Sequence, residues 1–135
     1  MVTFKPALAQ FHIIAPGDCM QIWWPSAATH VSVTVLAVTL RVAKRFNGGH
    51  YVHGADFIVY NPHSYVYESN GYRKTVKRVA RLSARYHSDD VRSVHTPEAP
   101  LLTPMEHATL LGYHAEHGGP EGNCVVPDEV LTACR

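Results

Sequence analysis

The feature that most constrains the fold is a run of about twenty residues, 27–46, that contains no turn signal: AATHVSVTVLAVTLRVAKRF. Its valine and threonine content favours a β-strand, but an ordinary strand has only about 5–6 residues. At helical spacing, Thr34, Arg41 and Arg45 fall on one narrow polar stripe, and valine and leucine cover most of the rest. Asn47-Gly48-Gly49 then offers the left-handed residue at which helices commonly end. The run therefore predicts a mostly buried helix.

Shorter apolar runs predict a small antiparallel sheet. Phe11–Ala15 and Met20–Trp24 flank the turn Pro16-Gly17-Asp18, which indicates a hairpin. Three β-rich runs separated by turn residues indicate a meander: His50–Val52, Phe57–Tyr60 and Tyr65–Glu68.

Two further helices are expected. Residues 72–87, YRKTVKRVARLSARYH, form the clearest helical pattern, and the polar residues 88–103 that follow indicate a surface loop. Thr103-Pro104-Met105-Glu106 is a capping box that starts a helix to about His117, where Gly118-Gly119-Pro120 ends it. A last helical turn is expected after Pro127-Asp128. The chain thus predicts one α+β domain over residues 1–135, a small antiparallel sheet (hairpin plus meander) packed with about three helices.

Composition places the chain among folded globular proteins. Hydrophobic residues make up 46% and charged residues 17% of its 135 residues, which suits a single domain. The N-terminus lacks the pattern of a secretory signal, and no apolar run is long enough to span a bilayer. Three cysteines, an odd number, favour reduced thiols over a disulfide scaffold. We therefore expect a cytoplasmic protein.

The net charge of +1 conceals an uneven distribution. Residues 1–87 hold ten Lys or Arg against three acidic residues, whereas residues 88–135 hold two against eight. This balance excludes an acidic DNA mimic, which needs a large negative field.

The expected helix 72–87 concentrates the positive charge. At helical spacing its six cations share one face: Arg73, Lys74, Lys77, Arg78, Arg81 and Arg85. Like charges four residues apart repel one another, so this face predicts an anionic partner, either nucleic acid or an acidic protein surface. Two alternatives stay open, because the acidic last third of the chain could cover the face or water could solvate it.

No pattern predicts catalysis or a cofactor. The sequence lacks a GxSxG motif and a Cys/His pair in a recognisable context, and Asn47-Gly48-Gly49 lacks the GK[ST] of a phosphate loop. We expect no enzyme activity, no cofactor and no metal. The ligand types of a zinc site do occur in His114, His117, Cys124 and Cys134, at a spacing that matches no standard finger, so zinc binding stays open. His50 and His53 with Asp56 are a second, weaker set.

Several stretches together resemble antirestriction proteins of the ArdB/KlcA type, small α+β proteins of plasmids and phages. The matching stretches, between residues 36 and 122, are Arg45-Phe46-Asn47-Gly48-Gly49-His50-Tyr51, Phe57-Ile58-Val59-Tyr60-Asn61-Pro62, Asn70-Gly71-Tyr72-Arg73, Leu82-Ser83 and residues 110–121. The sequence departs from the family pattern in a short connection between Gly49 and Pro62, a more basic segment after Gly71, and a cysteine-bearing tail without a counterpart.

The resemblance implies an anti-defence protein of a phage or plasmid that acts in the cytoplasm of a bacterial host. It would inhibit a type I restriction–modification system by non-enzymatic binding to the restriction complex or to its DNA-tracking state. The six cations would then be its docking surface. Two other functions stay open. The protein could be a small nucleic-acid-binding or regulatory protein of a mobile element. It could also inhibit another defence system, with a target such as a CRISPR effector or a signalling nucleotide that it holds in a pocket. Partner identity, direct DNA binding and oligomeric state are not predicted.

Overall fold

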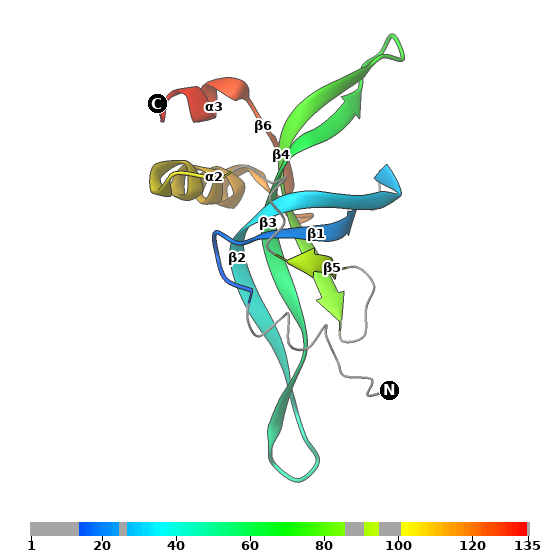
Figure 1. The fold of residues 1–135 in the computed structure, drawn as a ribbon, viewed down its shortest axis with the longest axis vertical. Coiled ribbons are helices and arrows are strands. Elements are labelled where there is room, and N and C mark those ends of the chain that lie inside the picture. Colours follow the sequence, from blue (N-terminus) through cyan, green and yellow to red (C-terminus); the bar gives the residue numbers. More distant parts are fainter. Residues whose placement is uncertain (1–13, 25–26, 86–90, 95–100, 135) are drawn as a thin grey trace.

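The computed structural model describes residues 14–24, 27–85, 91–94 and 101–134. Six strands form one antiparallel sheet in the order β5-β1-β2-β3-β4-β6. The strands are β1 (Cys19–Trp24), β2 (Thr29–Lys44), β3 (His50–Tyr67), β4 (Arg73–Arg85), β5 (Val91–Val94) and β6 (Asn123–Val126), and the helices are α2 (Pro104–His117) and α3 (Asp128–Thr132). The predicted α+β packing with about three helices is therefore wrong, because sheet dominates the described chain and its two helices are short (Figure 1).

The run that predicted a helix over residues 27–46 is strand β2. Its first half pairs with β1 up to Thr34, and the part from Thr34 to Lys44 pairs with β3. The strand is long because it takes part in two hairpins that are offset along it. Two register shifts interrupt its pairing with β3, at Val35/Ala37 and Arg41/Val42, and such bulges bend and twist a strand.

Strand β3 replaces the predicted meander of three short strands. Residues 50–60 pair with β2, and residues 54–67 pair with β4, so the turn residues expected near Gly54 and Pro62 lie inside one bulged strand. The register shift between Asn61 and Ser64 absorbs Pro62, which has no N–H to donate to the ladder.

Strand β4 replaces the predicted basic helix 72–87. It pairs with β3 along its length, and its Lys77–Ala80 segment also pairs with β6. These two ladders override the helical propensity of its lysine, arginine, alanine and leucine residues. The expected loop 88–103 contains the edge strand β5, which pairs with β1.

The C-terminal predictions are confirmed. Helix α2 begins at the capping box, in which Thr103 Oγ1 accepts from the Glu106 N–H and Glu106 Oε1 accepts from the Thr103 N–H. It ends at Gly118. The expected last turn is α3, which follows Pro127. The predicted partner strand of Met20–Trp24 lies mainly outside the described residues, and β1 pairs with β2 and β5.

Two apolar clusters form the core. One joins the sheet strands β1 to β4 through Met20, Trp24, Phe57 and Ala80. Trp24 of β1 and Ala80 of β4 line one cavity although two strands separate β1 from β4 in the sheet, so the sheet curls. The second cluster packs α2, α3 and β6 against β2, β3 and β4: Leu36, Tyr60, Val79, Leu110, Cys124, Val126 and Leu131.

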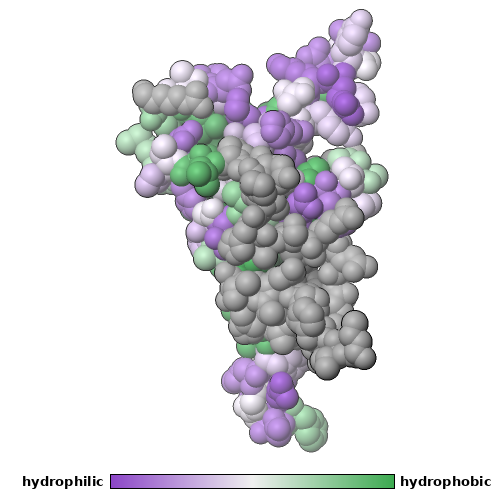
Figure 2. All heavy atoms as spheres, viewed as in Figure 1, coloured by the Kyte–Doolittle hydropathy of each residue, from purple (hydrophilic) through white to green (hydrophobic). Residues whose placement is uncertain are grey.

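The β2–β3 and β3–β4 hairpins extend beyond the rest of the sheet at opposite ends of the molecule (Figure 1). We call residues 44–51 the β2–β3 tip and residues 65–74 the β3–β4 tip. In Figure 2 the β3–β4 tip is mostly hydrophilic, whereas the β2–β3 tip shows hydrophobic surface beside hydrophilic residues.

Candidate functional site

The six cations predicted to share a helix face do not share one face of the strand. Successive side chains of a strand point to opposite sides of the sheet. The cations therefore divide between the two sides of the sheet. Four positions lie on one side, Arg73, Lys77, Arg81 and Arg85, and two lie on the other, Lys74 and Arg78. Arg85 ends β4, and its side chain lies outside the described part of the structure. The prediction of a single cationic face is therefore wrong, because these positions form two smaller sets, and their role as a docking surface stays a prediction.

Lys77 is neutralised within the chain. Its Nζ lies 2.5 Å from Oδ1 of Asp128 at the start of α3. The hydrogen bond and the charge of Lys77 hold the pKa of Asp128 below its ordinary value. Among the described residues of the acidic last third of the chain, Asp128 is the one carboxylate that forms an ion pair with a cation of β4.

Arg81 and Arg78 are held by neutral groups. Arg81 donates to the Pro120 carbonyl at 3.1 Å, and Gly122 packs so closely that an added Cβ would lie 2.9 Å from the Cβ of Arg81. Arg78 donates from Nε to Ser64 Oγ at 3.0 Å and from Nη1 to Asn123 Oδ1 at 2.7 Å. Both arginines therefore connect β4 to the segment around β6 without losing their charge.

The β3–β4 tip combines exposed tyrosines with cations. The guanidinium carbon of Arg73 lies 4.9 Å from the centre of the Tyr65 ring, and Tyr65 and Tyr67 meet edge to face at 5.4 Å. Tyr67 and Tyr72 are 69% and 73% exposed. Gly71, with φ of +86°, makes the turn. The tip thus presents aromatic faces beside Arg73 and Lys74.

The β2–β3 tip repeats this combination. The guanidinium carbon of Arg45 lies 5.4 Å from the centre of the Tyr51 ring, and Phe46 is fully exposed. The Arg45 carbonyl accepts from Gly48 N–H at 3.0 Å, and Gly48 has φ of +92°. Asn47-Gly48-Gly49 is therefore a hairpin turn and not the end of a helix.

Most of the described cations lack a carboxylate partner. Arg41 donates from Nε to Asp56 Oδ1 at 2.9 Å and from Nη2 to Ser83 Oγ at 3.0 Å, and Ser83 also donates to Asp56. Arg41 and Lys77 are the two cations that form ion pairs where the structure describes side chains. Six others there form none: Lys44, Arg45, Arg73, Lys74, Arg78 and Arg81.

The candidate zinc ligands each have another partner. His114 Nε2 lies 3.0 Å from the Gly122 carbonyl oxygen, His117 stacks on Tyr113 at 4.0 Å, and the Cys134 thiol donates to Thr109 Oγ1. All three cysteines are free thiols, and burial raises the pKa of Cys124. Over the described ranges, no group of three or more His, Cys, Asp or Glu side chains could hold a metal ion, including the His50, His53 and Asp56 set.

Comparison with models of protein families, with curated proteins and with solved structures gives no match. No described helix has the length and apolar character needed to cross a membrane. The relation to ArdB/KlcA-type proteins stays a prediction, although the segments before Asn47 and after Gly71 are strands where the resemblance implied helices.

The residues that sequence reasoning missed are the exposed aromatics at the tips. Asn70-Gly71 between β-rich runs is a strong hairpin signal, and it places Tyr67 and Tyr72 on either side of the turn. The helical interpretation of residues 72–87 concealed this signal.

Proposed function

We propose that this protein binds single-stranded nucleic acid through its two hairpin tips. The observation that carries the proposal is the repeated pairing of an arginine with a tyrosine, Arg45 over Tyr51 and Arg73 over Tyr65, at the ends of two projecting hairpins. Each pair stands beside a further exposed aromatic ring and a lysine without an ion pair in the described structure.

Two physical terms support this choice. Cations without carboxylate partners attract phosphates, and binding a phosphate releases condensed counterions. Exposed aromatic rings stack on bases of any identity, a contact worth about 1–3 kcal/mol per base. A duplex buries the faces of its bases, so stacking on Phe46, Tyr67 or Tyr72 requires unpaired bases.

The separation of the tips sets the length of strand that can reach both. Tyr51 and Tyr65 lie fourteen residues apart on β3, which corresponds to at most about 46 Å at about 3.3 Å per residue. A stacked strand rises about 3.4 Å per nucleotide, so about 14 nucleotides span this distance. Oligonucleotides that are too short to span the distance between the tips can engage only one tip and lose the gain from linked binding.

Fluorescence anisotropy with labelled oligothymidylates tests the proposal. We expect a 20-mer to bind more tightly than a 6-mer, and both to bind more tightly than a 20-base-pair duplex. The double variant Tyr67→Ala, Tyr72→Ala removes two exposed rings and is expected to weaken 20-mer binding at least about tenfold. Trp23→Ala is the matched control, because Trp23 is also exposed but lies on β1.

Three results would contradict the proposal: no saturable binding of the 20-mer at low salt, tighter binding of the duplex, or an equal loss in the Trp23→Ala control. Because both tyrosines are largely exposed, thermal unfolding of the double variant should match that of the wild type. A drop in stability would identify a folding effect.

Inhibition of a type I restriction complex is a second proposal. The segment that best matches the antirestriction pattern, Arg45–Tyr51, is a projecting tip with Phe46 fully exposed, and exposed aromatics are common anchors in protein interfaces. Phage plating on a restricting host tests it. Phe46→Ala is expected to reduce protection while leaving unfolding unchanged, and a strain that gains no protection from the wild-type protein would exclude this function.

A further inference from the structure

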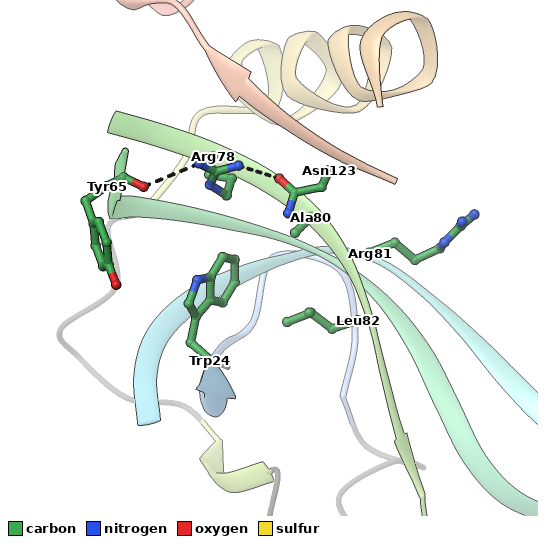
Figure 3. A pocket seen from close by; sticks show the side chains of 7 residues that line it. All are labelled: Trp24, Tyr65, Arg78, Ala80, Arg81, Leu82 and Asn123. Carbon is green, nitrogen blue, oxygen red and sulfur yellow. Dashed lines mark hydrogen bonds between the residues drawn. The ribbon is translucent and has the colours of Figure 1, made fainter. Parts of the chain in front are cut away.

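A cavity of about 330 Å³ lies between the end of β1 and the middle of β4. Its lining consists of Trp24, Tyr65, Arg78, Ala80, Arg81, Leu82 and Asn123. Figure 3 shows Trp24 between Tyr65 and Leu82, with Arg78 and Asn123 on one side of the indole and the Arg81 side chain directed away. The volume is in the range of sites for small molecules, about 300–1,000 Å³.

One end of this cavity presents a fixed positive charge. The Arg78 guanidinium donates to Ser64 Oγ, Asn123 Oδ1 and the Tyr65 carbonyl at 3.0, 2.7 and 3.4 Å. An arginine has five N–H donors, so one N–H remains on each terminal nitrogen. No carboxylate pairs with Arg78 in the residues that the structure describes. A part-buried guanidinium that has no carboxylate partner and one N–H left on each terminal nitrogen favours an anion with two adjacent oxygens.

The other end of the cavity is apolar. Trp24 is 5% exposed and Ala80 is 2% exposed, and Leu82 packs against the same cluster. The Asn123 amide lies at the Arg78 end (Figure 3). Its oxygen accepts from Arg78, which leaves the NH₂ group to donate to a ring nitrogen or a carbonyl oxygen.

From this arrangement we infer that the cavity binds a nucleotide, with the base against Trp24, Ala80 and Leu82 and the phosphate at Arg78. The site shares Tyr65 with the β3–β4 tip and goes beyond the function proposed for the tips. A free nucleoside monophosphate and one nucleotide of a bound single strand present the same chemistry, and the experiment below distinguishes the two sources.

Trp24 itself is the probe. Trp23→Phe removes the other tryptophan of the chain, which is 38% exposed, and leaves Trp24 as the single indole. This variant is titrated with AMP, with inorganic phosphate and with the thymidylate 20-mer while indole fluorescence is recorded. We expect saturable quenching by AMP at lower concentration than any response to phosphate. Quenching by the 20-mer but not by AMP would show that the strand supplies the nucleotide.

Arg78→Gln in the same background is expected to weaken AMP binding at least about tenfold, because it removes charge-assisted hydrogen bonds. Lys77→Gln is the matched control, because Lys77 is adjacent to Arg78 on β4 but does not line the cavity, and it should change binding less than about twofold. Asn123→Ala, which keeps the charge, provides a second test if Arg78→Gln fails to fold. The inference is overturned if neither AMP nor the 20-mer quenches Trp24, or if Lys77→Gln weakens binding as much as Arg78→Gln. The two proposals can fail separately, because anisotropy with the tip variants measures strand binding and quenching of Trp24 by AMP measures binding in the cavity.

Discussion

The salt dependence of strand binding is the sharpest prediction for the hairpin tips, because it tests how many cations contact phosphates. We compare the wild type with Lys44→Gln, Lys74→Gln, which removes one cation from each tip. The control is Lys77→Gln, Asp128→Asn, which removes a cation and its own ion-pair partner and so keeps the net charge at +1.

The magnitude follows from the cations that lack an ion pair. Four lie at the tips: Lys44, Arg45, Arg73 and Lys74. Each phosphate neutralised in a single strand contributes about −0.7 to the slope of log K against log salt, so four give about −2.8. Raising salt from about 50 to 200 mM then weakens wild-type binding about 50-fold. With two cations removed, the slope is about −1.4 and the same change weakens binding only about 7-fold.

The assay is anisotropy of the labelled 20-mer at four salt concentrations between these limits. The control variant is expected to keep the wild-type slope, since Asp128 already neutralises Lys77. The reasoning is refuted if the tip variant keeps the wild-type slope, or if the control slope falls as far as that of the tip variant.

Further predictions concern the folded state and are measured by chemical denaturation. Burial raises the pKa of Asp56, but hydrogen bonds from Arg41 and Ser83 and the charges of Arg41 and Arg81 outweigh it, so this pKa lies below its ordinary value. Its stabilising contribution is therefore present above about pH 4 and is lost as pH falls through the folded-state pKa, and Asp56→Asn should flatten this acid dependence. Phe57→Ala removes a fully buried ring and should lower the free energy of unfolding by about 3–5 kcal/mol. Thr103→Ala removes the cap of α2 and should lower it by about 1 kcal/mol. A loss below about 1 kcal/mol for Phe57→Ala would contradict the core assignment.

Local signals in the sequence predicted the C-terminal elements correctly. Thr103 and Glu106 are three residues apart, and their reciprocal hydrogen bonds need no contact from the rest of the chain. The turn after Pro127 was equally local. Such elements can be predicted because the groups that satisfy the backbone are close in sequence.

Strands β2 and β4 could not be predicted in this way. The valine and threonine content of β2 favours a strand, but the run is too long for a strand that takes part in a single hairpin. Its two halves pair with different neighbours, β1 and β3. In β4 the residues have good helix propensity, and partners far away in sequence, β3 and β6, decide the conformation.

The same difference between local and long-range contacts applies to the candidate site. The sequence alone determined which residues are cationic, where the glycine turns lie and how α2 begins, because these depend on residue identity and near neighbours. Only the tertiary structure decided that residues 73–85 alternate across a sheet, that Asp128 neutralises Lys77, and that Trp24 and Arg78 line one cavity. Side-chain direction follows from the strand period, and ion pairs and cavities form between segments that are far apart in the sequence and that only the folded sheet brings together.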